Sequence, residues 1–188
     1  MEIKLTPEQI GQRRATAYHE AGHVVACLRL GIIFYSVELD TGGGIAGCVA
    51  YPQEIYRKTE TAIDRLMAER DILVSACGPA AEARATSNYN HDSGFFDRAD
   101  MEEAICNLVG YPVQLQTWEM RLEKLAYEMF TKEDGRGTRA WWKVMEIAKE
   151  LLKNGKLSES ECMDIAFSGV LPLRRLHQDF RVFPWMRL

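Results

Sequence analysis

The chain has 188 residues, which is enough for one sizeable hydrophobic core, and we expect a single domain over residues 1–169 with a short extension over 170–188. Hydrophobic residues make up 47% of the sequence and charged residues 27%, which argues against a disordered chain. The net charge of -4 argues against a general nucleic-acid-binding protein, because phosphate binding draws on clustered Lys and Arg side chains.

The sequence also gives no sign of a membrane span, a secretory signal or a disulfide framework. Its longest apolar stretch, residues 24–37, is interrupted by Arg29 and Gly31, and the start of the chain lacks the apolar segment of a signal peptide. The five cysteines are widely spaced and form no CxxC pair: Cys27, Cys48, Cys77, Cys106 and Cys162. We therefore expect a cytoplasmic protein whose cysteines are buried free thiols.

The first predicted element is a long helix that begins at Pro7 and ends at about Leu30. Thr6 and Gln9 have the spacing of a capping box, and Pro7 occupies the first helical position, where a proline removes no hydrogen bond. Apolar residues then recur at helical spacing until Gly31, a residue type that commonly ends helices.

A β-hairpin and several further helices are predicted after it. Residues 34–40 alternate like a strand, residues 41–46 form a glycine-rich turn, and residues 47–52 form a second short strand. The later elements are a helix over 59–85 with a kink or boundary at Pro79, a loop over 87–96, helices near 98–110, 113–130 and 138–152, and a short helix capped by Ser158 with Glu161. This order predicts an α+β, mainly helical fold with a small antiparallel hairpin or sheet beside the first helix.

Two histidines lie in the second half of the first helix. The segment HEAGH, residues 19–23, has the HExxH pattern, in which His19 and His23 share one face of a helix and Glu20 lies beside them. Zinc hydrolases use this arrangement to bind the metal through both imidazoles and to employ the glutamate as a general base. The pattern therefore predicts a Zn²⁺ site with His19 and His23 as ligands and Glu20 as the catalytic residue.

A catalytic zinc ion commonly has three protein ligands, so a third ligand is needed. The metzincin pattern is excluded, because Ala26 and Arg29 occupy the positions of its glycine and its third histidine. A glutamate soon after the motif is a weak option, since Glu38 and Glu54 fall on a predicted strand and a predicted turn.

The segment AYHEAGHVV, residues 17–25, resembles the HEAGH motif of the FtsH-type ATP-dependent zinc metalloproteases. The following features occur in a similar order. A hairpin with a glycine-bearing turn comes first, then CGPAAEA at 77–83 in place of the family's GG-x-x-AE stretch, and then SGFFDRAD at 93–100 in place of TG-x-x-ND. The resemblance extends over residues 13–165, although only HEAGH is specific by itself.

In that family the TG-x-x-ND segment opens a helix and supplies an aspartate as the third zinc ligand. The corresponding segment here carries a short insertion, which leaves Asp97 and Asp100 as candidates. We favour Asp100. The family's aspartate is followed directly by an apolar residue and four residues later by an alanine, and Met101 and Ala104 have these positions relative to Asp100.

Three further residues stay open as parts of the site. His91 and Asp92 lie in a polar loop and are alternative metal ligands. Glu82, on the predicted helix 59–85, either orients a histidine ring through its Nδ1 atom or belongs to a solvated helix face.

The resemblance implies a zinc-dependent endopeptidase that acts on peptides or unfolded proteins in the cytoplasm. FtsH-type proteins also carry a membrane anchor and an ATPase module, which this sequence lacks, so we expect the peptidase domain alone, with an ATPase or unfoldase partner in trans left open. Two other interpretations stay open: a peptidase dedicated to one regulatory partner, and a non-catalytic interaction module on the same scaffold. The basic and aromatic C-terminal extension either packs on the domain or docks a partner.

Overall fold

The computed structural model describes residues 5–39, 47–50, 62–88, 95–109 and 115–168. The elements are, in chain order, α1 (Pro7–Leu30), β1 (Ser36–Leu39), β2 (Gly47–Ala50), α2 (Ala62–Thr86), α3 (Phe95–Val109), α4 (Leu115–Phe130), α5 (Arg139–Asn154), β3 (Lys156–Ser158) and α6 (Glu159–Phe167). The described part is mainly helical with a small antiparallel sheet, so the predicted α+β class is confirmed. The C-terminal extension lies outside the described residues.

Helix α1 begins and ends where the sequence predicts. The Gln9 amide donates a hydrogen bond to the Thr6 hydroxyl at 3.2 Å, and the Thr6 amide donates one to the Gln9 side chain at 2.8 Å, so the capping box is formed. At the other end Gly31 has a φ of 65°, a left-handed conformation that terminates the helix. Both histidines of the HEAGH segment therefore lie in the interior of a regular helix, where a spacing of four residues places them on one face.

The predicted hairpin consists of β1 and β2, which pair antiparallel with Val37 opposite Val49. The turn between them, predicted over residues 41–46, lies outside the described residues. The sequence did not predict β3, which pairs antiparallel with the other side of β1 and places Leu157 opposite Val37. Strand β1 is thus the middle strand, and its Val37 and Leu39 side chains are buried.

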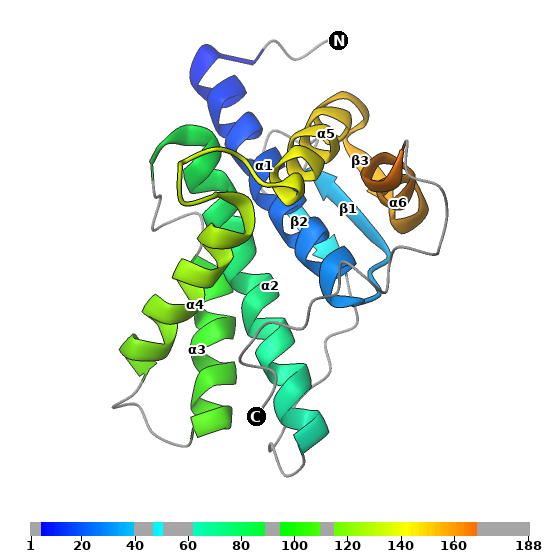
Figure 1. Cartoon of the computed structure of the whole chain (residues 1–188). Coiled ribbons are helices and arrows are strands. Elements are labelled where there is room, and N and C mark those ends of the chain that lie inside the picture. The colour runs from blue at the N-terminus through cyan, green and yellow to red at the C-terminus, as the bar shows by residue number, and fades with distance from the viewer. Residues whose placement is uncertain (1–4, 40–46, 51–61, 89–94, 110–114, 169–188) are drawn as a thin grey trace.

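Helix α1 lies at the centre of the molecule (Figure 1). Helices α2, α3 and α4 lie on one side of it, and the sheet lies with α5 and α6 on the other. Ten residues of α1 between Ala17 and Cys27 are buried. The HEAGH segment is therefore enclosed from both sides and belongs to the interior of the protein.

Helix α2 packs against α1 and continues through Pro79, so the proline does not mark a helix boundary. The ring nitrogen of Pro79 has no hydrogen to donate to the carbonyl of Ser75, which is the usual cost of proline inside a helix. The two helices approach closely at Gly22, where a Cβ atom would lie 2.5 Å from the Cys77 carbonyl oxygen and 2.7 Å from the Cβ of Ala81. A glycine at this position lets the backbone of α1 lie directly against α2.

Helix α3 begins at Phe95, whereas the sequence predicts a start near Arg98. Asp97 consequently lies in the first helical turn, whereas the predicted helix begins just after it. The remaining helices are close to their predicted positions, and α6 begins with the predicted capping box between Ser158 and Glu161.

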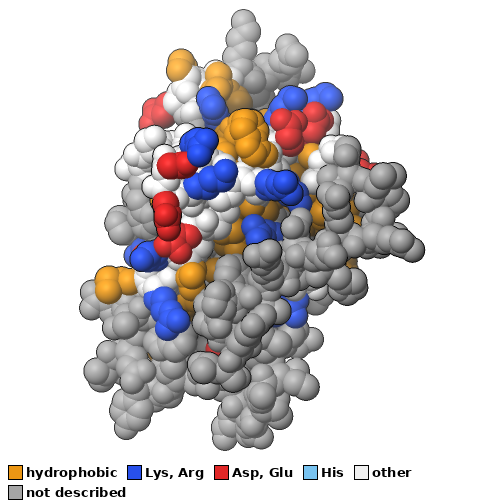
Figure 2. Space-filling model, viewed as in Figure 1, with side chains coloured by type: hydrophobic (Ala, Val, Ile, Leu, Met, Phe, Trp, Pro, Cys, Tyr) orange, Lys and Arg blue, Asp and Glu red, His pale blue; other side chains and the backbone are white. Residues whose placement is uncertain are grey.

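The structure also describes part of the surface and four of the five cysteines. On the face seen in Figure 2, Lys and Arg side chains are interspersed with Asp and Glu. No helix of the described residues combines the length and the hydropathy of a membrane span. Cys27, Cys77, Cys106 and Cys162 are free thiols, and all but Cys106 are buried.

Candidate metal centre

His19 and His23 lie on the buried face of α1 and direct their Nε2 atoms toward one carboxylate. The two residues are 6% and 7% exposed. His19 Nε2 lies 2.9 Å from Oδ2 of Asp97, and His23 Nε2 lies 3.2 Å from Oδ1 of the same residue. The candidate ligand atoms all lie within 4.8 Å of one another. His19, His23 and Asp97 therefore form a group that can hold a metal ion.

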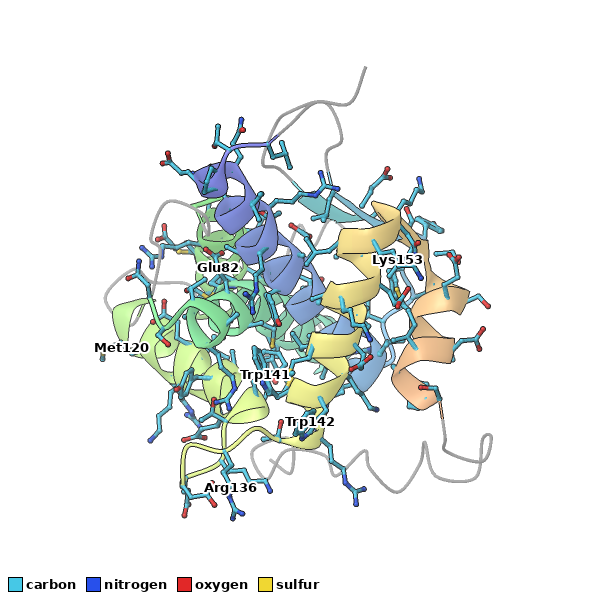
Figure 3. All side chains as sticks on the ribbon, turned by 90° about the horizontal axis from the view of Figure 1, so that it is seen from above. Glu82, Met120, Arg136, Trp141, Trp142 and Lys153 are labelled. Atoms are coloured by element: carbon cyan, nitrogen blue, oxygen red, sulfur yellow. The ribbon has the colours of Figure 1, made fainter. Side chains whose placement is uncertain are left out.

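The other nitrogen of each ring is held by α2. His19 Nδ1 lies 3.0 Å from Oε2 of Glu82, which projects from α2 beside α1 (Figure 3), and His23 Nδ1 lies 2.9 Å from the carbonyl oxygen of Val74. A carbonyl can only accept a hydrogen bond, so the Nδ1 atom of His23 donates its proton to Val74. His19 has a carboxylate at each ring nitrogen, and when its Nε2 atom binds a metal the proton stays on Nδ1, facing Glu82. With both rings protonated at Nδ1 alone, both Nε2 lone pairs point into the centre, as metal binding requires.

The carboxylate at this centre belongs to Asp97, which corrects the preference for Asp100. Both oxygens of Asp97 face the histidines, and its side chain is 23% exposed. Asp100 lies three residues further along α3 and is exposed. The preference was wrong because it relied on the residues that follow the aspartate, whereas the start of α3 at Phe95 and its packing on α2 decide which carboxylate reaches the histidines.

The electrostatics of the group require a positive charge at its centre. With both rings neutral and protonated at Nδ1, two nitrogen lone pairs would face two carboxylate oxygens in a buried place. Burial lowers the pKa of His19, but hydrogen bonds to Asp97 and Glu82 outweigh it and raise the pKa to about 10. Burial raises the pKa of Asp97, yet the charge of His23 and the hydrogen bonds of both rings hold that pKa well below its usual range. Protons or a metal cation can supply this charge.

Gly78 provides the space in which the ring nitrogens converge. A Cβ atom at this position of α2 would lie 2.2 Å from Nε2 of His23 and 2.8 Å from Nε2 of His19. A side chain of any size at position 78 would thus occupy the place where the candidate ligand atoms meet. The glycine therefore belongs to the centre although it contributes no ligand.

Glu20 is buried beside the two histidines. It is 5% exposed, and its carboxylate makes no hydrogen bond with another residue of the described part. Burial raises the pKa of Glu20, against the opposite influence of His23 and His19. A buried carboxylate with a raised pKa is suited to accept and release a proton.

Of the remaining candidate ligands from the sequence, the structure describes only Glu38, and it does not join this group. Glu38 lies on β1 and forms an ion pair with Lys156 at 3.0 Å. Glu54, His91 and Asp92 fall outside the described residues. Among the residues that the structure describes, His19, His23 and Asp97 are the one group of three such side chains close enough to share a metal ion.

Sequence reasoning missed two parts of the centre. The Val74 carbonyl carries no sequence signal, since every residue has one. Gly78 does carry a signal, because a glycine in the middle of a long helix costs stability and so indicates a close approach.

No protein-family model matches the sequence, and no curated protein matches it. The resemblance to FtsH-type metalloproteases therefore depends on the HEAGH motif and on the order of the features that follow it.

Proposed function

We propose that this protein is a zinc-dependent endopeptidase that hydrolyses peptides or unfolded proteins. The observation that carries the proposal is the convergence of two Nε2 atoms and the Asp97 carboxylate in the interior, with the buried carboxylate of Glu20 next to them. Two imidazoles and one carboxylate are the ligand set of several catalytic zinc sites, in which a fourth position stays open for water or substrate.

The donors favour zinc over other common metals. Calcium and magnesium prefer sites made of oxygen ligands, whereas imidazole nitrogen suits zinc and its neighbours among the transition metals. The bond between His19 Nδ1 and Glu82 is the carboxylate–histidine contact that commonly supports zinc ligands. The FtsH-type resemblance agrees, because that family takes its third ligand from the start of a helix, and Asp97 lies in the first turn of α3.

Each residue of the centre then has a defined role. Zinc held by His19, His23 and Asp97 would polarise the scissile carbonyl and lower the pKa of water to about 7. Glu20 accepts the proton of the attacking water and passes it to the leaving amine, for which its raised pKa is suited. Glu82 and the Val74 carbonyl keep both rings in the tautomer that directs Nε2 inward.

The cytoplasm is the compartment that we propose for this activity. The described cysteines are free thiols, three of them buried, as is usual in a reducing compartment.

The test combines zinc content with the hydrolysis of an unfolded protein such as casein. Glu20→Gln is expected to keep zinc and to lose hydrolysis by roughly a hundredfold to ten-thousandfold, because an amide cannot accept the proton. His19→Ala is expected to lose both zinc and hydrolysis. Asp97→Asn and Asp100→Asn are a matched pair on one helix, and only the first is expected to weaken zinc binding.

The outcomes separate the proposal from its alternatives. Full zinc occupancy in His19→Ala would remove the metal assignment, and normal turnover by Glu20→Gln would remove the general base. A wild-type protein that holds zinc and cleaves neither casein nor short peptides would instead support a non-catalytic module or a peptidase dedicated to one partner.

A further inference from the structure

A cavity of about 210 Å³ opens beside the metal centre. Residues of three helices line it: Ser75, Ala76, Pro79, Ala80 and Ala83 of α2, Asp97, Arg98 and Met101 of α3, and Glu123 and Tyr127 of α4. Asp97 is the residue that the cavity and the metal centre share, whereas His19, His23 and Glu20 do not line it. A group bound in the cavity would therefore lie next to the metal without displacing the histidines or the base.

The walls of the cavity are mainly apolar. Five small or rigid residues of α2, of which only Ser75 is polar, form one side, and the buried thioether of Met101 lies on α3. Tyr127 is 46% exposed and lies where the cavity meets solvent. Apart from Asp97, the charged residues in the lining are Arg98 and Glu123, whose side chains lie 3.7 Å apart as an ion pair. These surroundings favour an apolar group, because a charged one would lose its hydration without a dedicated partner.

We propose that this cavity is the specificity pocket of the peptidase and receives one apolar side chain, of the size of Leu or Phe, from a residue that flanks the scissile bond. The inference rests on the proposed function. The volume is below the roughly 300–1,000 Å³ typical of sites for whole small molecules, and so suits a single side chain. Its position fits as well, because one wall is the carboxylate that would hold the metal, and a peptide bond at the metal places its neighbouring side chain a few ångströms away.

The test is a peptide series in which the residue on each side of the mapped cleavage point is Gly, Leu, Phe, Asp or Lys. The wild-type protein is expected to cleave the best Leu or Phe peptide about tenfold faster or more, in kcat/KM, than its Gly counterpart, as the burial of a large apolar side chain allows. Asp and Lys at the same position are expected to resemble Gly or to be worse.

The chain offers a matched pair of substitutions. Ala83 is half-buried and lines the cavity, whereas Ala99 on α3 is exposed and does not. Ala83→Leu is expected to fill the cavity and reduce the preference for Leu and Phe to less than about threefold, while Ala99→Leu keeps the wild-type preference. Tyr127→Ala, at an exposed position, is expected to weaken the same preference through loss of the outer wall.

Two readouts keep this inference separate from the proposed function. Zinc content is measured for every variant, and binding of the same peptides is measured with zinc-loaded Glu20→Gln, which needs no turnover. A wild-type protein without side-chain preference, or Ala83→Leu that is fully loaded with zinc and keeps the wild-type preference, would overturn the pocket. If neither the wild type nor any variant hydrolyses peptides, the proposed function fails. The pocket is then tested by binding alone, and equal binding of the Leu and Gly peptides by zinc-loaded Glu20→Gln would overturn it.

Discussion

Gly78 has no room for a side chain, because the histidine rings of the metal centre lie directly against its Cα atom. Because its missing Cβ atom would lie 2.2 Å from Nε2 of His23, Gly78→Ala is expected to push the ring away and to reduce zinc binding by at least about tenfold. The measurement is the zinc dissociation constant, obtained by competition with a chromophoric chelator.

Gly11 is the control for this substitution, since it also lies within a helix, and a Cβ atom added to it would have no other atom within 4 Å. Gly11→Ala is expected to leave zinc binding unchanged and to raise stability by roughly 0.5–1 kcal/mol, because alanine loses less backbone entropy in a helix. Equal zinc affinity in Gly78→Ala and the wild type would show that the two Nε2 atoms are not the ligands.

The metal-free protein is expected to lose stability as the pH rises above neutral. Against the effect of burial, Asp97 and Glu82 raise the pKa of His19 from 6.5 to about 10, so the folded chain keeps a proton that the unfolded chain releases. The stability from this proton is fully present below pH 6.5 and is lost as the pH rises through 10. The raised pKa of Glu20 acts in the same direction, because its charged form is disfavoured inside the fold.

Urea unfolding of the chelator-treated protein between about pH 6 and about pH 9 measures this loss. His19→Gln is the control, since it removes one of the titrating groups and should make the profile less steep than that of the wild type. Metal-free wild-type protein whose stability stays constant or increases over this interval would contradict the assigned role of His19.

At the residue scale, the sequence predicted the parts of the centre that depend on helical spacing. His19, Glu20 and His23 follow from one regular helix, whose ends are fixed by local signals. Asp97 could not be chosen over Asp100, because that choice depends on where α3 starts and on its packing against α2. Short-range patterns do not determine either of these.

Among the helices, an aromatic stack connects α1, α2 and α5. The ring of Trp141 on α5 stacks on Tyr18 of α1 at 5.6 Å between centroids, and the guanidinium of Arg84 on α2 lies 4.8 Å from the Trp141 ring centre. Tyr18 precedes His19 in the chain and Arg84 follows Glu82 by two residues, so the stack involves the same segments of α1 and α2 as the metal centre. The contact fixes α5 against the pair of helices that hold the ligands.

Trp141→Ala is therefore expected to destabilise the fold by roughly 3 kcal/mol, through lost packing and lost cation–π contact. Its neighbour Trp142 is 60% exposed and lies on the outer side of α5 (Figure 3), so Trp142→Ala should change stability by less than about 0.5 kcal/mol. Urea unfolding of both variants provides the measurement, and equal effects would contradict the packing described for α5.

At the scale of elements, the sequence predicted helices and strands whose signals are local. The capping boxes at Thr6 and Ser158 and the alternation of β1 determine their own segments. Strand β3 was missed because it has only three residues and forms through pairing with β1, more than a hundred residues earlier. Of the two interpretations of Pro79, a kink or a boundary, the boundary is wrong, because α2 continues past it while packed against α1.

The fold encloses the HEAGH segment of α1 between two layers. Helix α1 has α2, α3 and α4 on one side and the sheet, α5 and α6 on the other, which leaves His19, Glu20 and His23 only 5–7% exposed. The fold class follows from the apolar patterning of the sequence, but this central position of α1 arises from tertiary packing. Under the proposed function, this position limits which substrates can reach the metal centre.

A substrate must bring its backbone into this enclosed centre, and the backbone of a stable domain is held in its own secondary structure. A stable domain costs about 5–15 kcal/mol to unfold, so its open state is populated at less than about one part in a thousand. We therefore predict that the protein cleaves a permanently unfolded variant of a small domain at least about a thousandfold faster than the native domain with the same cleavage sites. Gel or mass-spectrometric time courses of both forms measure the ratio.

The control is the same native domain with a flexible tail, which carries a sequence that the protein cleaves in a free peptide. It tests whether an extended segment can reach the centre. The tail is expected to be cut at the rate of a free peptide while the domain stays intact, because an extended segment can enter the centre without prior unfolding. Similar rates for the native and the unfolded domain would show that the centre is more accessible than its burial indicates. If the protein cleaves the free peptide but not the tail of the native substrate, the folded substrate domain blocks entry. The limiting step would then be the approach to the centre and not the unfolding of the substrate.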